Sequence, residues 1–243
     1  MTRSHTSGGR FRGYAAPVQI GVATRGTWLS AGVLAVAAAA WVALLARDSA
    51  MDDGMAMGAE LERAGIWLLA WATMMAAMML PSTTPLVALY GKRARRAAQT
   101  VLLVGGYLTV WTTVGAVAYG LNRIAPDPGS GLVAAVLIIA GIYQFTPVKD
   151  ACLRHCRSPV DFLLTHWHGG TFGALRIGVE HGAYCVGCCW ALMAVLVIAG
   201  AMGLVWVVGI ALAVAAEKLL PAGATLGRIG GIALVAAGVA VAV

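Results

Sequence analysis

A segment rich in cysteine lies at residues 181–190, which read H-G-A-Y-C-V-G-C-C-W. On a helix, its histidine and three cysteines fall within one arc of about 100°, because residues three and four apart share a face. These residues are His181, Cys185, Cys188 and Cys189. Thiolate and imidazole together form the ligand set of zinc, Cu(I) and iron–sulfur centres. Cysteines also pack as small apolar side chains, but an ionisable histidine at membrane depth favours metal or redox chemistry.

A second pair of cysteines lies in the preceding segment K-D-A-C-L-R-H-C-R-S-P. Cys152 and Cys156 are four residues apart, which places them on one face of a short helix expected from about 149 to 157. His155 is a further candidate ligand, and the neighbouring arginines favour the thiolate forms. Because this segment is expected in the cytoplasm, a lasting disulfide is disfavoured there, and metal ligation or redox work remains.

Four methionines form a row in M-M-A-A-M-M-L, directly before Pro81. The row contains Met74, Met75, Met78 and Met79. Members four residues apart stack as two thioether pairs on a helix. Most methionines inside a membrane pack, but this row is expected at the depth of the cysteines, so one pair is predicted to line the sulfur site. Pro81 leaves a backbone carbonyl unpaired, and a neighbour or a cavity must satisfy it.

Composition indicates a membrane protein. Of the 243 residues, 60% are hydrophobic and 11% are charged, whereas soluble domains carry about 25% charged residues. Apolar stretches close to the ~20 residues that cross a bilayer predict an all-α, polytopic transmembrane helical bundle of six or seven spans. The predicted spans are 28–46, 66–86, 100–121, 132–147, 183–199, 203–217 and 226–243.

The basic residues predict the orientation. With seven spans and a cytoplasmic N-terminus, all but three of the 17 lysines and arginines face the cytoplasm. Residues 1–27 are expected to be a disordered basic cytoplasmic tail. Residues 28–243 are expected to form a single transmembrane helical domain, with a cytoplasmic Cys/His segment at about 148–182. We expect a multi-pass protein of the cell inner (plasma) membrane, surrounded by membrane lipids, and no nucleic-acid partner.

Four other ionisable residues are expected near the edges of the membrane. Glu217 and Lys218 stand side by side near the end of the sixth predicted span. They are expected to mark the cytoplasmic boundary, with the lysine extending to the interface, and a role in neutralising the sulfur site is secondary. His166 and His168 are expected at the membrane interface rather than among the ligands.

The chain resembles a bacterial family of predicted metal-binding integral membrane proteins, a domain of unknown function with some members labelled copper chaperones. Four motifs carry the resemblance: A-M-M-L-P-S-T-T-P, Y-Q-F-T-P-V-K-D-A-C-L-R-H-C-R-S-P, H-G-A-Y-C-V-G-C-C-W-A-L-M and A-E-K-L-L-P. The similarity runs from residue 60 or so to the C-terminus. It implies the five cysteines, His181 and the methionines of residues 75–79 as candidate ligands. Tyr143, Gln144 and Lys149 are members of the motif without a clear role.

These observations favour an integral membrane protein that binds a soft metal ion, Cu(I) ahead of zinc or iron. The ion would be transported or delivered, with a cuproprotein or a metallochaperone as partner, and an enzymatic role is not favoured. Two alternatives stay open. In the first, the chain is a membrane thiol–disulfide oxidoreductase that uses Cys152/Cys156 and Cys185/Cys188 as exchanging pairs. In the second, it is a structural partner subunit of a membrane complex whose sulfur side chains only pack.

Overall fold

The computed structural model describes residues 25–50, 60–94, 97–124, 129–198 and 203–243. Throughout these ranges the regular structure is helical, which confirms the predicted all-α class. The helices are α1 (Arg25–Ala50), α2 (Glu60–Arg93), α3 (Ala97–Ile124), α4 (Ser130–Tyr143), α5 (Pro147–Arg157), α6 (Pro159–Thr165), α7 (Gly170–Ile198), α8 (Leu204–Leu219) and α9 (Gly223–Ala242). Disorder is predicted for residues 1–27. Of these, residues 1–24 lie outside the described ranges.

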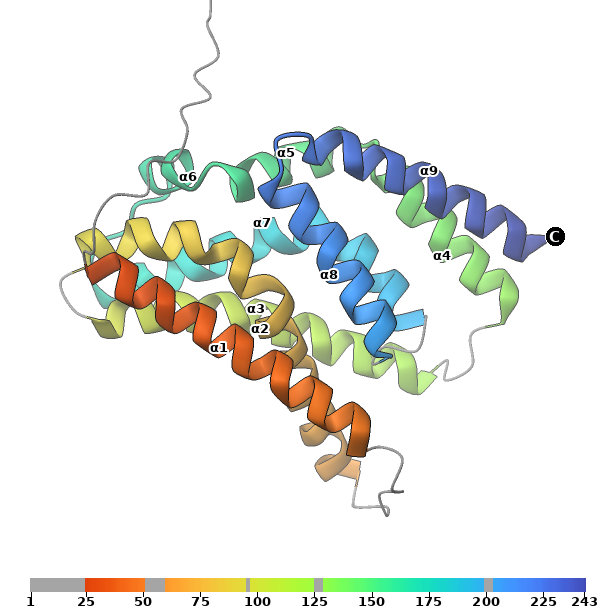
Figure 1. Ribbon diagram of the computed structural model, residues 1–243, viewed down its shortest axis with the longest axis horizontal. Helices are drawn as coiled ribbons and strands as arrows, with labels where there is room; N and C mark the ends of the chain where they lie inside the picture. The colour runs from red at the N-terminus through yellow and green to blue at the C-terminus, as the bar shows by residue number, and fades with distance from the viewer. Residues whose placement is uncertain (1–24, 51–59, 95–96, 125–128, 199–202) are drawn as a thin grey trace, which may run out of the picture.

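Three helix pairs make the most extensive contacts: α3 with α7, α1 with α2, and α4 with α9. Figure 1 shows α1 along α2 on one side of the bundle, and α9 beside α4 on the other. Glycines bring α3 and α7 close together. A Cβ at Gly178 would lie 2.0 Å from the carbonyl oxygen of Leu103, and one at Gly106 would lie 2.5 Å from that of Leu175. The backbones of α3 and α7 are therefore in direct contact, as in membrane helix pairs with small residues at the interface.

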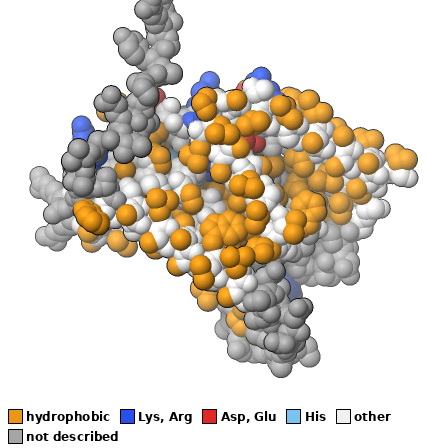
Figure 2. Space-filling model, in the orientation of Figure 1, with side chains coloured by type: hydrophobic (Ala, Val, Ile, Leu, Met, Phe, Trp, Pro, Cys, Tyr) orange, Lys and Arg blue, Asp and Glu red, His pale blue; other side chains and the backbone are white. Residues whose placement is uncertain are grey.

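Five helices are long and apolar enough to cross a membrane, namely α1, α2, α3, α7 and α9. The pair α4–α5, bent by 66°, would make a sixth span if it is counted as one. Helix α8 has 16 residues and is therefore about 24 Å long, somewhat short of the ~30 Å hydrocarbon core. Figure 2 shows hydrophobic side chains over much of the visible face. These features are consistent with a membrane protein.

Helix α2 is bent (Figure 1) and contains Pro81 and Pro85. Pro81 has no N–H to donate to the carbonyl of Ala77, four residues earlier. The indole Nε1 of Trp41, in α1, donates to that carbonyl instead, at 3.1 Å. The prediction that a neighbour satisfies this carbonyl is confirmed, and the contact ties α1 to the part of α2 that carries the methionine row.

The segment between α4 and α7 forms two short helices. Thr146 caps the start of α5, where its side chain accepts a hydrogen bond from the backbone N–H of Lys149, and Pro147 follows at the first helical position. Ser158 ends α5 and Pro159 begins α6, so the predicted short helix and its end are confirmed. Gly170, with φ of 79°, then allows the sharp turn into α7.

Helix α7 begins at Gly170, and the predicted start of the fifth span near residue 183 was wrong. Arg176 and Glu180 lie in the part of the helix before residue 183, four residues apart, and pair at 2.8 Å. Such a pair stabilises a helix rather than interrupting it. The cysteines of α7 therefore lie near the middle of a long helix, and not in its first turn.

Candidate metal centre

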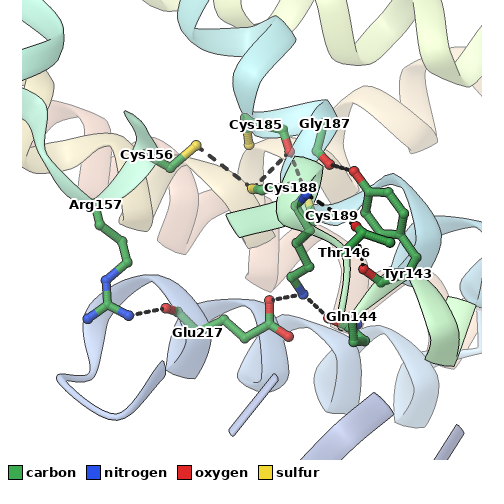
Figure 3. Close-up of polar contacts among 11 residues, drawn as sticks. Tyr143, Gln144, Thr146, Cys156, Arg157, Cys185, Gly187, Cys188, Cys189 and Glu217 are labelled. Carbon is green, nitrogen blue, oxygen red and sulfur yellow. Dashed lines mark hydrogen bonds and ion pairs between the residues drawn. The ribbon is translucent and has the colours of Figure 1, made fainter. Parts of the chain in front are cut away.

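Three thiols from two helices meet inside the bundle. Cys185 and Cys188 lie on α7, and Cys156 reaches them from α5. Their sulfur atoms all lie within 4.8 Å of one another, and those of Cys156 and Cys188 are 3.8 Å apart (Figure 3). All three side chains are buried. This group, named here the thiol cluster, offers only sulfur donors, which suit soft metal ions.

Tyr143, the last residue of α4, and Cys152 of α5 both contact α7 at Gly187. The hydroxyl of Tyr143 donates to the carbonyl oxygen of Gly187 (Figure 3). A Cβ at Gly187 would lie 2.6 Å from the sulfur of Cys152, so the missing side chain makes room for that thiol. Cys152 therefore sits in the α5–α7 contact and is not one of the three thiols of the cluster. The close approach of the two helices brings Cys156, one turn further along, to Cys188.

The other two members of the predicted arc on α7 are also buried, but they have different neighbours. The thiol of Cys189 donates to the carbonyl oxygen of Cys185 at 2.9 Å. The ring of His181 lies 5.8 Å from that of Tyr107 and 5.0 Å from that of Phe162. Its Nδ1 is buried and has no hydrogen-bond partner among the described residues.

A buried lysine lies against the thiol cluster. The Nζ of Lys218, from α8, is 2.9 Å from the sulfur of Cys185. It also lies 3.4 Å from the hydroxyl of Ser82 and 3.7 Å from the sulfur of Met79. Lys218 is 7% exposed. The prediction that this lysine extends to the membrane interface was therefore wrong, because sulfur and hydroxyl partners inside the bundle hold its ammonium group.

A second buried lysine pairs with the neighbouring glutamate. The Nζ of Lys149 lies 2.6 Å from a carboxylate oxygen of Glu217 and also donates to the side-chain oxygen of Gln144. Arg157 donates to the backbone carbonyl of Glu217 at 3.1 Å (Figure 3). Glu217 and Lys218, consecutive residues of α8, thus have different partners. Glu217 contacts α5, whereas Lys218 contacts α7 and α2.

The methionine row lies in the core beside this site. Met74, Met75 and Met79 have no exposed surface, and Met78 is 4% exposed. Met79 reaches the site through its contact with the Nζ of Lys218. Which thioether pair lines the thiol cluster stays a prediction.

His155 faces away from the cluster that Cys156 joins. Its Nδ1 donates to the carbonyl oxygen of Ala151 at 2.9 Å, and its ring stacks on that of Tyr184 at 4.2 Å. Consecutive residues of a helix point in different directions. This explains why Cys156 joins the cluster and His155 does not.

A comparison with known families identifies the chain. A family model described as copper chaperone, PpoB2, matches residues 68–241. The chain belongs to the PpoB2 family of copper chaperones. The matched residues include the methionine row, the thiol cluster and both buried lysines, whereas α1 precedes them. No curated protein and no solved structure matches the chain.

Sequence reasoning gave Lys218 only a secondary role, in neutralising the sulfur site, and it did not join Cys156 to the cysteines of α7. Lys149 and Gln144 stood in a family motif, but without a role. The signal for Lys218, Lys149 and Gln144 was the same: a charged or amide side chain inside or next to an apolar stretch needs a buried partner. The sequence contains these groups, but it does not say which of them meet.

Proposed function

We propose that this PpoB2-family protein is an integral membrane protein that binds Cu(I) at the thiol cluster for transport or for delivery to a cuproprotein. The single observation that carries the proposal is the meeting of three buried sulfur atoms, all within 4.8 Å of one another, from two helices. The copper-chaperone description of the family supports copper as the metal. A metallochaperone or a cuproprotein would be the partner.

The number of donors favours Cu(I) over zinc and iron–sulfur centres. Structural zinc sites use four ligands, and iron–sulfur clusters are held by four residues. Among the described residues, three thiols have all their sulfur atoms within 4.8 Å of one another. Soft thiolates select Cu(I), which accepts two or three donors. Met79, whose sulfur lies 3.7 Å from the Nζ of Lys218, is a candidate for a further sulfur ligand.

We place the protein in the inner membrane as a multi-pass bundle of six or seven spans with a cytoplasmic N-terminus. The proposal takes the basic residues 1–27 as a cytoplasmic tail and residues 28–243 as one transmembrane domain, in which α5 and α6 lie on the cytoplasmic side. Five apolar helices support this arrangement. Helix α4 would be the sixth span, with α5 on the cytoplasmic side of the 66° bend, and a seven-span protein would use α8 as well.

The test is Cu(I) loading of the purified protein in detergent without oxygen, followed by metal analysis and X-ray absorption. We expect copper bound to sulfur in the unmodified chain, and loss of this sulfur-bound copper in the combined variant Cys156→Ser/Cys185→Ser/Cys188→Ser. Cys152→Ser is the matched control, since Cys152 packs on Gly187 outside the cluster, and it should keep the sulfur-bound copper. A combined variant with undiminished copper–sulfur signal would sink the proposal.

One observation favours a second candidate, the thiol–disulfide oxidoreductase. The sulfur atoms of Cys156 and Cys188 are only 3.8 Å apart, so a modest shift brings them to bonding distance. The pairing differs from the predicted Cys152/Cys156 and Cys185/Cys188 pairs, because it joins α5 to α7. This function predicts mixed disulfides trapped by Cys156→Ser or Cys188→Ser, and no copper bound to the reduced protein.

A further inference from the structure

Three histidines gather with two aromatic residues where α5, α6 and α7 meet. His155 comes from α5, His166 from the end of α6, and His181 from α7. The rings of His155 and His166 have centroids 6.0 Å apart. The ring of Phe162 contacts both other histidines, at 4.6 Å from the ring of His166 and 5.0 Å from that of His181. We call His155, His166 and His181 the histidine group.

The backbone fixes which nitrogen of His155 is free to bind. Nδ1 of His155 lies 2.9 Å from the carbonyl oxygen of Ala151. A carbonyl oxygen only accepts, so Nδ1 carries the proton and Nε2 carries the lone pair. Metal-binding histidines show the same arrangement, in which one ring N–H donates to a carbonyl and orients the other nitrogen toward the ion.

His166 is oriented in the same way. Its Nδ1 lies 3.2 Å from the carbonyl oxygen of Phe162 and 2.8 Å from the hydroxyl of Thr165. The Thr165 hydroxyl donates to the carbonyl oxygen of Asp161 at 2.8 Å, so it accepts from Nδ1. The lone pair of His166 is therefore on Nε2, whose contact with the hydroxyl of Tyr184 is a long 3.4 Å.

The ring positions suit a shared ion. A metal–imidazole bond of about 2.0 Å places the centroids of two imidazoles on opposite sides of one ion about 6 Å apart, close to the separation of His155 and His166. His155 stacks on Tyr184 and His166 stacks on Phe162. Stacking uses the ring faces, whereas metal binding uses the ring edges, so the stacking contacts and an ion do not compete. An ion at Nε2 of His166 would replace only the long contact with the hydroxyl of Tyr184.

His181 connects this group to the thiol cluster. His155 and His166 are half-buried, whereas His181 is 2% exposed and its Nδ1 has no partner among the described residues. His181 lies one helical turn before Cys185 on the buried face of α7. Tyr107 touches both residues, with its ring 5.8 Å from that of His181 and its hydroxyl 3.0 Å from the sulfur of Cys185.

We propose that His155 and His166 form a separate Cu(I) site, from which the ion passes by way of His181 to the thiol cluster. This inference rests on the proposed function of the thiol cluster. Each step is a ligand exchange in which a copper–nitrogen bond breaks as the next copper–ligand bond forms. Copper stays Cu(I) and the released imidazole stays neutral. The proton of a receiving thiol leaves to water at the half-exposed edge of the group, since metal binding releases thiol protons.

The first test uses the variant Cys156→Ser/Cys185→Ser/Cys188→Ser in detergent, titrated with Cu(I) alone without oxygen and examined by X-ray absorption. We expect nitrogen-bound copper, which is lost when His155→Ala and His166→Ala are added. His168→Ala is the matched control, because this half-buried histidine of the same segment pairs with Glu180 at 3.4 Å, and it should retain that copper. Absence of nitrogen-bound copper, or its survival without His155 and His166, overturns the proposal.

The second test uses chains with all cysteines present and follows the rise of thiolate-to-copper absorbance after mixing with Cu(I). His155→Ala/His166→Ala should slow loading of the thiol cluster while the final copper–sulfur signal stays the same. An unchanged loading rate overturns the proposal. This measurement also separates the two proposals: a missing copper–sulfur signal in the unmodified chain overturns the thiol-cluster function, whereas an unchanged rate with a normal signal overturns only the histidine site.

Discussion

The ammonium group of Lys218 contacts the thiol cluster through the sulfur of Cys185. Charged groups interact strongly where water is scarce, and an unpaired charge is costly there. Metal binding requires thiolates, and each thiolate adds a negative charge to an apolar bundle. The Nζ of Lys218, 2.9 Å from the sulfur of Cys185, offsets one of these charges. At the proposed metal site the lysine would therefore act on the ion through its thiolate partner and not as a ligand.

Replacing Lys218 by methionine should weaken Cu(I) binding by about 10–100-fold, the usual effect of removing a group that supports a ligand. Lys218→Arg keeps the charge and should recover part of the affinity. The measurement is competition for Cu(I) against a chelator of known affinity. Lys92→Met, which changes an exposed lysine at the end of α2, serves as control. Equal affinity of Lys218→Met and the unmodified protein would rule out this role.

The pair of Lys149 and Glu217 should matter for stability. Lys149→Met leaves the carboxylate of Glu217 buried without its cation, and breaking such a pair costs about 3–5 kcal/mol. Adding Glu217→Gln removes the uncompensated charge, so the double variant should be more stable than Lys149→Met alone. Thermal unfolding in detergent, followed by circular dichroism, checks both. If the double variant is as unstable as the sum of the single ones, the two residues do not act as a pair.

At the scale of elements, the contact between α3 and α7 positions the cysteines. The most extensive helix contacts include this pair, and its glycines allow backbone to meet backbone. Any residue with a Cβ at these positions must push the helices apart. Since α7 carries Cys185 and Cys188 while α5 carries Cys156, a shift of α7 also changes the distances within the thiol cluster.

Two adjacent glycines of α3 allow a matched comparison. A Cβ at Gly106 would lie 2.5 Å from the carbonyl oxygen of Leu175, whereas nothing lies within 4 Å of one at Gly105. Gly106→Ala should therefore lower stability by about 1–3 kcal/mol, the range for overpacking, and should weaken copper binding. Gly105→Ala should leave both unchanged or raise stability slightly, because alanine favours helix. Unfolding in detergent and chelator competition measure the two effects, and equal behaviour of the two variants would contradict this account.

Local patterns predicted the elements well and their tertiary partners poorly. Thr146, Pro147 and Ser158 set the bounds of α5, and these signals act within a few residues of the chain. The spacing of Cys152 and Cys156 likewise placed both on one face of α5. Spacing says nothing about the opposite helix, however, so the meeting of Cys156 with Cys188 could not be predicted. Lys218 was misplaced for the same reason, because its sulfur and hydroxyl partners lie on α7 and α2.

At the scale of the whole molecule, the orientation of the bundle is open to a direct test. The basic residues around α5 and α6 favour the cytoplasmic side. Alkaline phosphatase, which is active only outside, should be inactive when fused within residues 160–165 and active when fused at residue 126. A fusion after Val243 should be active in a seven-span protein and inactive in a six-span one. Active phosphatase at residues 160–165 would reverse the orientation.

The global class could be predicted because composition and apolar length depend on the entire chain and not on any one contact. The number of spans could not, since α8 has 16 residues and α4–α5 is bent by 66°. The lengths of α8 and of α4 lie between that of a helix that crosses the bilayer and that of a short buried helix. The pairing of Arg176 with Glu180, in the part of α7 before residue 183, is likewise invisible to a hydropathy average.

Helix α1 supplies the hydrogen bond from Trp41 to the carbonyl of Ala77, so loss of α1 would leave this carbonyl without its donor. Helix α1 precedes the matched residues 68–241, so a homologue could lack it. Such a homologue would expose the carbonyl freed by Pro81 to lipid tails, which offer no donor. It would have to supply a substitute, such as a hydroxyl within its own α2 or an indole from a second subunit. A tryptophan or hydroxyl gained at that depth should therefore accompany every natural loss of the first helix.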